Sequence, residues 1–386
     1  MRHQWVLVLV GLLVSSCGQL QPPKEKARPF RFEKLDLTRS DENGRPLWRL
    51  VSPLTRYQLE ERRSSLSDPV ATIYKDGKPK YTITAPKGLV IDDGRRVELY
   101  EGVTFRVLDD RQIVVRAERV FWQRDYEVVN FEGQPTLLDL TRRVVAGQAR
   151  FHTNTDTLFA WKGIKLKSWN GQRDETATPA LEVETQQVNW NTSSGAINMD
   201  FPIKGIQRPS PKQTRRLSSP SLVGNTRKEW YDFSAPVLIT EPEEALSIRA
   251  GRSRWWAAEE RITSAEPAQG SLKELNVSGR ALEIQQKQSL LTIKQDCRLL
   301  QPDQDLSAQR CSWNWDSGAV LAEGDVVLRR DELQQVTRAS RLEGVTGDDG
   351  RIKFSAPGQR VETQLQIQEK SPDPSAPSPA AAPVQF

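Results

Sequence analysis

Residues that commonly carry out catalysis or bind metals are scarce in this sequence. Its 386 residues include 2 histidines and 3 cysteines. Zinc-protease, Cys-x-x-Cys, nucleophile-elbow and phosphate-loop motifs are missing. One histidine, His3, stands in the N-terminal segment, and His152 beside Phe151 is interpreted as a surface or packing residue. Neighbouring carboxylates such as Glu259 and Glu260 face opposite sides of a strand and are interpreted as solvated charges. We therefore predict that the chain is not an enzyme and uses no cofactor or metal.

A strong charge of either sign is also missing. Lys and Arg number 55 against 50 Asp and Glu, which gives a net charge of +5, and the two signs are interleaved along the chain. A nucleic-acid-binding protein usually shows a clustered basic stripe instead. Hydrophobic residues make up 37% of the chain and the mean hydropathy is -0.60, which is enough for thin sheets with one buried face.

Long hydrophobic runs are limited to the N-terminus. The run from Trp5 to Val14 has 10 residues, fewer than the roughly 20 that cross a bilayer, and is typical of a secretory signal. It ends in Val14-Ser15-Ser16-Cys17, which resembles the lipobox of bacterial lipoproteins, whose cysteine becomes acylated. We predict a signal peptide over 1–16 and lipidation at Cys17. The alternative is ordinary cleavage that leaves a free thiol.

Two cysteines remain if Cys17 is consumed in this way. An exported protein can keep a disulfide, so we predict a bond between Cys297 and Cys311, across a hairpin whose turn is marked by Pro302-Asp303. The alternative is two free buried thiols.

Composition divides the chain into six segments. Proline-rich and polar stretches indicate tethers, linkers or tails, and alternating stretches indicate folded lobes. The predicted segments are the signal peptide 1–16, a lipidated tether 17–47, a first lobe 48–206, a linker or long loop 207–229, a second lobe 230–369 and a disordered tail 370–386.

Within the lobes the dominant hydrophobic period is two, which is typical of strands. Tyr81, Ile83 and Ala85 alternate with polar residues, and turn dipeptides such as Asp76-Gly77 separate the runs. A weak repeat with steps near 31 residues places glycines where bulges are expected and small alanines where layers approach closely. These glycines are Gly102, Gly133, Gly163, Gly324 and Gly344, and the alanines are Ala85, Ala117, Ala149, Ala308, Ala339 and Ala356. The sequence predicts an all-β fold.

One stretch of the first lobe resembles a known family. Residues 71–138 carry Tyr74 and Gly77, an alternating strand into Ala85, then Leu99-x-x-Gly102-Val103, Ala117-Glu118 and Gly133. This pattern resembles the LptC family of lipopolysaccharide-export proteins, and residues 306–330 carry similar pieces. Family members usually have a transmembrane helix where this chain has the lipobox-like motif, and they are about half as long.

The resemblance implies an elongated antiparallel β-jellyroll, with two sheets stacked in a V around an apolar interior that holds acyl chains. It also implies a non-catalytic periplasmic protein that passes lipopolysaccharide, or a similar acylated glycolipid, from an inner-membrane ABC transporter toward the outer membrane. Implied partners are the membrane subunits of that transporter and a periplasmic bridge protein that binds by strand addition. With the lipid anchor, we expect a periplasmic lipoprotein, held in the inner membrane.

The groove candidates are apolar residues on one face of the alternating strands. They are Ile73, Tyr81, Ile83, Leu99, Val103, Phe105, Ile113, Val115 and Phe151. The alternative is a dry sandwich core, which has the same pattern. End strands near 48–54 and 352–367 are candidate edges for strand addition. A different function stays open, because Trp255-Trp256 and Trp313-Asn314-Trp315 could stack on sugars in a carbohydrate-binding or carbohydrate-active envelope lipoprotein.

Overall fold

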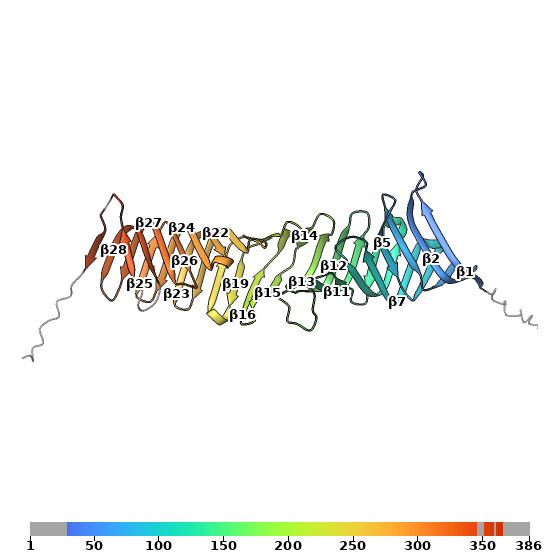
Figure 1. The fold of residues 1–386 in the computed structure, drawn as a ribbon, viewed down its shortest axis with the longest axis horizontal. Helices are drawn as coiled ribbons and strands as arrows, with labels where there is room; N and C mark the ends of the chain where they lie inside the picture. Colours follow the sequence, from blue (N-terminus) through green and yellow to red (C-terminus); the bar gives the residue numbers. More distant parts are fainter. Residues whose placement is uncertain (1–28, 346–350, 359, 366–386) are drawn as a thin grey trace, which may run out of the picture.

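The structure, a computed structural model, describes residues 29–345, 351–358 and 360–365. The predicted signal peptide, Cys17 and the predicted tail 370–386 lie outside the described residues. In the described part the chain forms thirty antiparallel strands and four short 3-10 turns, joined edge to edge into one long body (Figure 1). No helix among these residues is long and apolar enough to cross a membrane. The predicted all-β class, an elongated antiparallel β-jellyroll, is confirmed.

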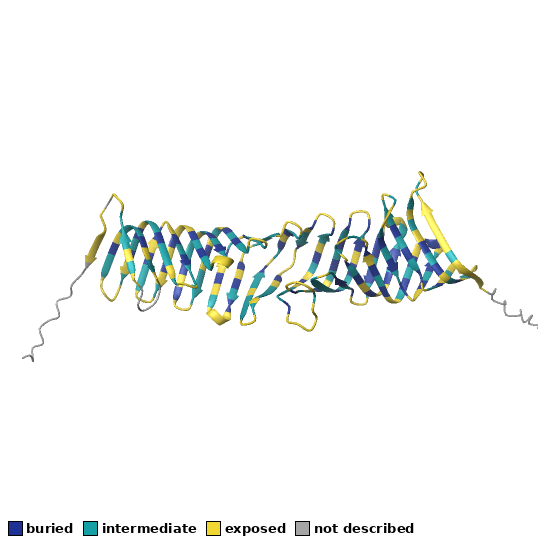
Figure 2. Cartoon of the chain, in the orientation of Figure 1, coloured by how far each residue is buried: buried dark blue, intermediate teal, exposed yellow. Residues whose placement is uncertain are grey.

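The strands of residues 30–191 make up the first section. Except in β1 (Phe30–Ser40), which is almost wholly exposed, their residues alternate between more exposed and more buried positions, as Figure 2 shows, because successive residues of a strand point to opposite faces. The strands are β1 (Phe30–Ser40), β2 (Pro46–Gln58), β3 (Arg63–Ser67), β4 (Val70–Lys75), β5 (Lys78–Thr84), β6 (Lys87–Ile91), β7 (Arg96–Val107), β8 (Val114–Gln123), β9 (Val128–Glu132), β10 (Thr136–Leu138), β11 (Arg142–His152), β12 (Thr157–Ser168) and β13 (Leu181–Asn191).

A middle section of eight shorter strands follows. These are β14 (Ala196–Met199), β15 (Ile203–Ser210), β16 (Gln213–Ser219), β17 (Leu222–Asn225), β18 (Trp230–Phe233), β19 (Val237–Glu241), β20 (Leu246–Ala250) and β21 (Ser253–Trp256). The last section holds β22 (Arg261–Leu272), β23 (Leu275–Gln285), β24 (Leu290–Gln301), β25 (Gln304–Ala308), β26 (Arg310–Asn314), β27 (Ala319–Arg330), β28 (Gln335–Val345), β29 (Ile352–Ser355) and β30 (Glu362–Leu365). The 3-10 turns are Asp92–Gly94, Arg124–Tyr126, Pro242–Glu244 and Gln286–Gln288.

Strand pairing sorts these strands into two stacked layers. In β7, residues 96–100 pair with β6, whereas residues 104–107 pair with β5. The long strands repeat this pattern, so one half of each lies in each layer. Layer A contains β6, β9, β14, β17, β18, β21, β26 and β29. Layer B contains β4, β5, β10, β15, β16, β19, β20, β25 and β30. The interior lies between the two layers.

The long strands change layer at bulges along one edge, which we call the bulge edge. The register of β7 against β8 shifts between Tyr100 and Val103, and that of β12 against β13 shifts between Trp161 and Ile164. Gly102 has a φ of 96°, a conformation that costs glycine little and other residues more. The predicted role of the repeating glycines at bulges is thus confirmed at Gly102, as it is at Gly163 and Gly324. The hairpin turns of both layers lie along the opposite edge, the turn edge.

Segment 207–229 was predicted to be a linker or long loop, and this prediction is wrong. The segment holds the end of β15 and all of β16 and β17, which pair with neighbours in the two layers. Its prolines fall where no ladder donor is needed: Pro209 at the register shift in β15, Pro211 in a turn and Pro220 between strands. Strand pairing therefore runs continuously from the first predicted lobe into the second.

The N-terminal boundary also differs from the prediction. The second half of the expected tether 17–47 is β1, which pairs with β2 along most of its length. Phe30 and Phe32 of β1 are about half exposed, so the strand is held mainly by its backbone hydrogen bonds to β2. Segment 48–54 is therefore not an edge, because β2 lies between β1 on one side and β3 and β4 on the other.

Aromatic side chains from both layers fill the interior of the first section. Tyr81 and Phe105 come from layer B, and Phe131 and Phe151 from layer A. Ring centroids lie 5.3 Å apart for Tyr81 and Phe151 and 5.5 Å apart for Phe105 and Phe131. Such pairs contribute about 0.5–1.5 kcal/mol each beyond burial. All four residues are at most 3% exposed.

Polar contacts close the turn edge of the same section. Asp156, in the layer A turn between β11 and β12, accepts hydrogen bonds from the Tyr81 hydroxyl and, at 2.9 Å, from the Lys75 ammonium, both of layer B. Arg111 of layer B donates to the carbonyl of Thr192 in layer A. Burial acts to raise the pKa of the Asp156 carboxyl, but the two donated hydrogen bonds and the positive charges of Lys75 and Lys80 together outweigh it, so the pKa is lowered. The two layers are thus tied together over these turns.

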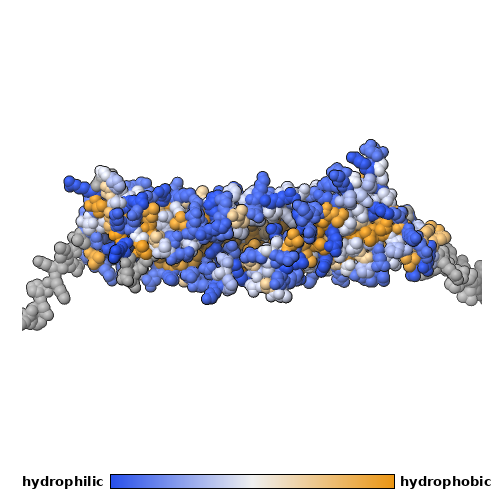
Figure 3. Space-filling view, in the orientation of Figure 1, coloured by the Kyte–Doolittle hydropathy of each residue, from blue (hydrophilic) through white to orange (hydrophobic). Residues whose placement is uncertain are grey.

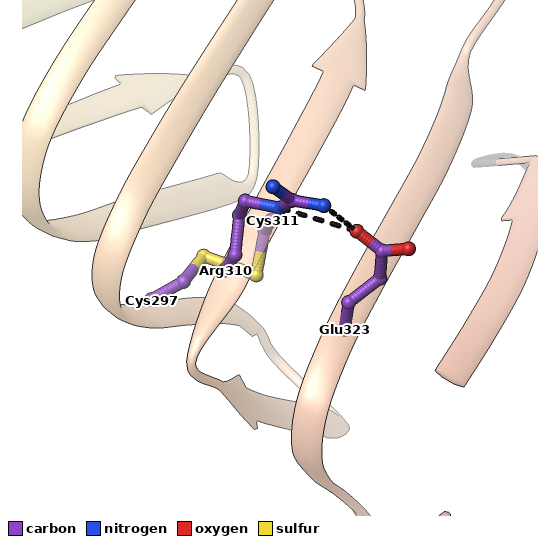
Figure 4. The surroundings of a disulfide bond; sticks show 4 residues. All are labelled: Cys297, Arg310, Cys311 and Glu323. Carbon is purple, nitrogen blue, oxygen red and sulfur yellow. Dashed lines mark hydrogen bonds and ion pairs between the residues drawn. A yellow bond between two sulfur atoms is a disulfide. The ribbon is translucent and has the colours of Figure 1, made fainter. Parts of the chain in front are cut away.

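The structure places Cys297 and Cys311 in a disulfide (Figure 4). Cys297 lies in the layer B half of β24, opposite Ala308, whereas Cys311 pairs with Ile293 in layer A. The bond therefore crosses between layers at the bulge edge and is not confined to one hairpin. Both cysteines are at most 3% exposed.

Removing this disulfide should destabilise the last section. The Cys297→Ala/Cys311→Ala variant should lose about 3 kcal/mol of unfolding free energy, because its unfolded chain regains the freedom of the closed loop. Thermal unfolding with and without reductant measures the effect: reductant should lower the Tm of the wild type and leave that of the variant unchanged. Free thiols at both positions in a non-reducing peptide mass spectrum would contradict the assignment.

Asp156 should make stability depend on acidity. A carboxyl whose pKa is lowered by folding stabilises the fold above its unfolded pKa, near 3.9, and this contribution disappears as the pH falls through the folded value. At pH 7 the Asp156→Asn variant should lose about 1.5–3 kcal/mol, the range for hydrogen bonds to a charged group. The difference from wild type should shrink below about pH 4.

Denaturant unfolding from pH 2 to 7 checks this dependence. Asp36→Asn is the matched control, because Asp36 forms an exposed pair with Arg49, and it should leave unfolding nearly unchanged. A stability difference for Asp156→Asn that stays constant down to pH 2 would argue against the ionic tie.

Candidate functional site

The candidate site is the space between the layers in the middle section. Each long strand of the flanking sections runs through both layers, but from β14 to β21 every strand belongs to one layer only. In residues 196–256 the layers are therefore linked only by short crossovers, such as Asp200–Pro202 between β14 and β15. In Figure 3 a hollow with a hydrophobic lining opens between hydrophilic edges over this part of the molecule.

A central cavity of about 290 Å³ occupies this space, and its wall is mainly apolar. Interior positions of both layers line it, at alternate residues of each strand. Layer B contributes Leu166, Leu181, Val183, Ile203, Leu217 and Ile239, and layer A contributes Ile197, Met199, Leu222, Tyr231, Phe233, Trp255 and Ile262.

A second cavity, of about 280 Å³, continues toward the last section. It shares Arg215, Ile239, Ile262 and Gln286 with the central cavity, so the two adjoin. A third cavity of about 330 Å³ lies farther on, between Leu299, Leu328 and Leu342. Open space between the layers thus recurs from the middle section toward the C-terminal end of the body, with a mainly apolar wall in the central cavity and a mixed wall in the other two.

Polar side chains line the turn edge of the central cavity. Along the layer B rim, residues paired from strand to strand form one row: Arg142, Ser168, Leu181, Gln207 and Arg215. The rim residues on layer A are Thr226, Glu229 and Gln286. An apolar floor with a polar rim suits an amphiphile whose hydrocarbon part is buried and whose polar part stays near water.

Arg215 and Glu241 form a buried ion pair where the two cavities adjoin. The guanidinium Nη2 lies 3.0 Å from Oε2 of Glu241, and the side chains are 17% and 4% exposed. Arg215 donates hydrogen bonds from Nε and Nη2 to that one oxygen. Because a guanidinium has five N–H donors, three remain for other partners.

Arg142 lies at the other end of the row, near Tyr231 of layer A. Burial raises the pKa of the Tyr231 hydroxyl, and the positive charge of Arg142 acts in the opposite direction. Within the described residues Arg142 forms no ion pair with a carboxylate, whereas its outward-facing neighbour Arg143 pairs with Glu175 at 2.9 Å. Arg142 therefore brings a half-buried positive charge to the cavity rim.

The nine residues predicted to line a lipid groove all lie in the first section, and all are at most 8% exposed. None of them lines the cavities described above, because the aromatic cluster fills their part of the interior. Their predicted contact with lipid stays a prediction. The residues that do border open space, such as Leu217 and Ile239, fall in or next to the segment interpreted as a linker.

The sequence did hold a signal for the middle section. Val237, Ile239 and Glu241 alternate with outward residues, and so do Tyr231 and Phe233. Runs of three to five residues among prolines, however, are too short to be assigned as strands from the sequence. The tryptophans also divide by face. Trp255 faces the central cavity and Trp313 the second cavity, whereas Trp256 lies beside Arg254 and Arg261 on the outer face. His152 is half-buried at the end of β11.

Among the described residues no group of three or more His, Cys, Asp or Glu side chains is placed to hold a metal ion. The site is therefore described by its shape, its apolar lining and its rim charges.

Comparison with known proteins relates the N-terminal third of the chain to one family. Residues 5–125 match the family model described as lipopolysaccharide-assembly, LptC-related. A search of curated proteins finds no match. Among solved structures, one match is LptH of Pseudomonas aeruginosa, described as the LptA-homologous periplasmic component of the lipopolysaccharide transport device. It aligns with 10% identity over 40% of this chain and 81% of its own. The TM-score is 0.19, which is too low to support an argument. Residues 5–125 are thus similar to the LptC-related family, in agreement with the resemblance found in the sequence.

Proposed function

We propose that this protein is a non-catalytic periplasmic component of lipopolysaccharide transport. In this role it passes lipopolysaccharide, or a similar acylated glycolipid, from an inner-membrane ABC transporter toward the outer membrane. The observation that carries the proposal is the LptC-related match over residues 5–125. The apolar cavities between the layers supply a physical means of holding acyl chains.

The energetics suit a carrier. Burying a methylene group stabilises by about 0.8 kcal/mol, so an acyl chain of about a dozen carbons gains on the order of 10 kcal/mol relative to water. Leaving a bilayer costs a similar amount. A chain that moves from a bilayer into the apolar cavities therefore changes little in free energy, and the ATPase of the transporter would supply the direction.

The proposed anchor and partners follow from the two ends of the chain. Lipidation at Cys17 would hold the protein at the inner membrane. At the C-terminal end β29 and β30 pair on one side only among the described strands, so each offers an edge to a bridge protein by strand addition. At the N-terminal end the corresponding edge is β1, which pairs with β2.

The rival function is carbohydrate binding through tryptophans of the outer face. Trp230 and Trp256 lie on the outer face with the Arg254 guanidinium 5.0 Å and 5.3 Å from their ring centroids. Arginine already lies over these rings, which leaves less ring surface for a sugar to stack on. We therefore favour the lipid-transport function.

A photo-crosslinking residue at Ile239 tests the cavity assignment. Ile239 borders both adjoining cavities and is 4% exposed, whereas its neighbour Leu238 points outward and is 37% exposed. Expressed in bacteria that make lipopolysaccharide, the protein should crosslink to acylated lipid several times more strongly from position 239 than from position 238. Mass spectrometry of the adduct identifies the lipid.

The pair Phe105 and Arg106 serves as the matched comparison in the filled first section. Lipid adducts at position 105 would mean that the aromatic cluster opens during transport. Equal crosslinking at positions 238 and 239 would argue against a lipid-filled interior.

Replacing Cys17 tests the anchor. The Cys17→Ala variant should move from the membrane fraction to the soluble periplasmic fraction, because no acyl chain can be attached to alanine. Its circular dichroism spectrum should match that of the wild type, since the change lies outside the sheet body. Membrane association that persists unchanged in the variant would contradict lipidation at this position.

A further inference from the structure

The polar rim of the central cavity bears more on which lipid is bound than its apolar floor does. Any acyl chain gains free energy from an apolar wall, so the floor alone does not distinguish one lipid from another. Discrimination comes from charged and polar groups placed where the headgroup must lie. The rim charges of this cavity therefore bear on which lipid it selects.

The two cations of the layer B rim belong to one row of paired residues. Arg142 is paired with Ser168, Leu181 with Gln207, and Gln207 with Arg215. Four strand spacings of about 4.8 Å separate the strands of Arg142 and Arg215, so the two positions lie roughly 19 Å apart along the body. The central cavity lies between them, and both residues border it.

Both guanidiniums have donors to spare. Arg142 forms no ion pair within the described part of the chain, and Arg215 directs its two hydrogen bonds at one oxygen of Glu241. Guanidinium groups bind phosphate with paired, charge-assisted hydrogen bonds. The interactions gain strength beside a low-dielectric wall such as the apolar lining here.

We propose that Arg142 and Arg215 bind the phosphate groups of an acylated lipid whose hydrocarbon chains occupy the central cavity. This inference rests on the proposed function and specifies the headgroup chemistry of the same site. An acylated lipid with phosphate near both ends of its headgroup matches a rim with one cation at each end. Glu241 holds Arg215 in place from the side of the second cavity.

Binding of two single-chain amphiphiles to the full-length protein tests the assignment. Dodecyl phosphate and dodecyl maltoside share a hydrocarbon chain and differ in headgroup charge, and isothermal titration below their critical micelle concentrations gives both affinities. The wild type should bind dodecyl phosphate more tightly. The Arg142→Gln variant should bind it about tenfold more weakly, the effect of losing a charge-assisted hydrogen bond, with no change for dodecyl maltoside.

Matched variants separate rim charge from general charge and from folding. Arg143→Gln alters the adjacent outward-facing arginine and should leave both affinities unchanged. Because Arg215→Gln alone would leave Glu241 buried without a cation, the Arg215→Gln/Glu241→Gln double variant is the suitable change at that end. The double variant should weaken dodecyl phosphate binding more than dodecyl maltoside binding.

The outcomes distinguish the inference from the proposed function. If neither amphiphile binds the wild type, the cavity takes no acyl chain and both fail. If both bind but Arg142→Gln and Arg143→Gln behave alike, the transport function stands and the headgroup assignment is wrong. Mass spectrometry of lipid that copurifies with wild type and with Arg142→Gln then separates the sources: loss of phosphorylated glycolipid supports the assignment, and loss of phospholipid alone overturns it for glycolipid.

Discussion

The fold depends on whether a single strand runs through both layers. Where it does, as in β7 or β12, one continuous backbone holds the layers together at the bulge edge, and the glycine at the bulge accepts the required turn of the chain. From β14 to β21 no strand does this, and only short crossovers join the layers. The central cavity coincides with that change in connectivity. The same alternation of apolar residues thus gives a filled sandwich in the first section and the apolar wall of the central cavity in the middle section.

Much of the fold could be predicted from the sequence because its signals are local. The period of two, the turn dipeptides and the glycines at Gly102 and Gly163 each concern residues close together in the chain. The difference between core and cavity concerns side chains that meet across layers, such as Tyr81 and Phe151, or Tyr81 and Asp156, 75 residues apart. A period-two pattern is identical in both cases, so the nine groove candidates could not be separated from core residues. The prolines of segment 207–229 predict a linker, but proline also occurs at strand ends and in turns, which is where the structure places them.

Two independent features support the proposed function, and they lie in different parts of the chain. The LptC-related match covers residues 5–125, which include the filled part of the interior. The central and second cavities begin beyond that match, at Arg142 and later residues. Because the two features lie in different residues, each supports a lipid-handling role independently of the other. The residues that line the central and second cavities therefore belong to the part of the chain that follows the match.

The contrast between the sections has a consequence for how a lipid would move. A chain lying in the central cavity meets the aromatic cluster and the Asp156 tie on the N-terminal side, and adjoining apolar space past Ile239 on the C-terminal side. Displacing the cluster means separating aromatic contacts and opening a buried ionic tie. The second cavity, in contrast, adjoins the central cavity directly, beside the Arg215–Glu241 ion pair, and its lining is part polar and part apolar. Open space therefore continues from the central cavity toward the last section, whereas side chains fill the interior of the first section. An acyl chain longer than the central cavity could extend into the second cavity without displacing the aromatic cluster.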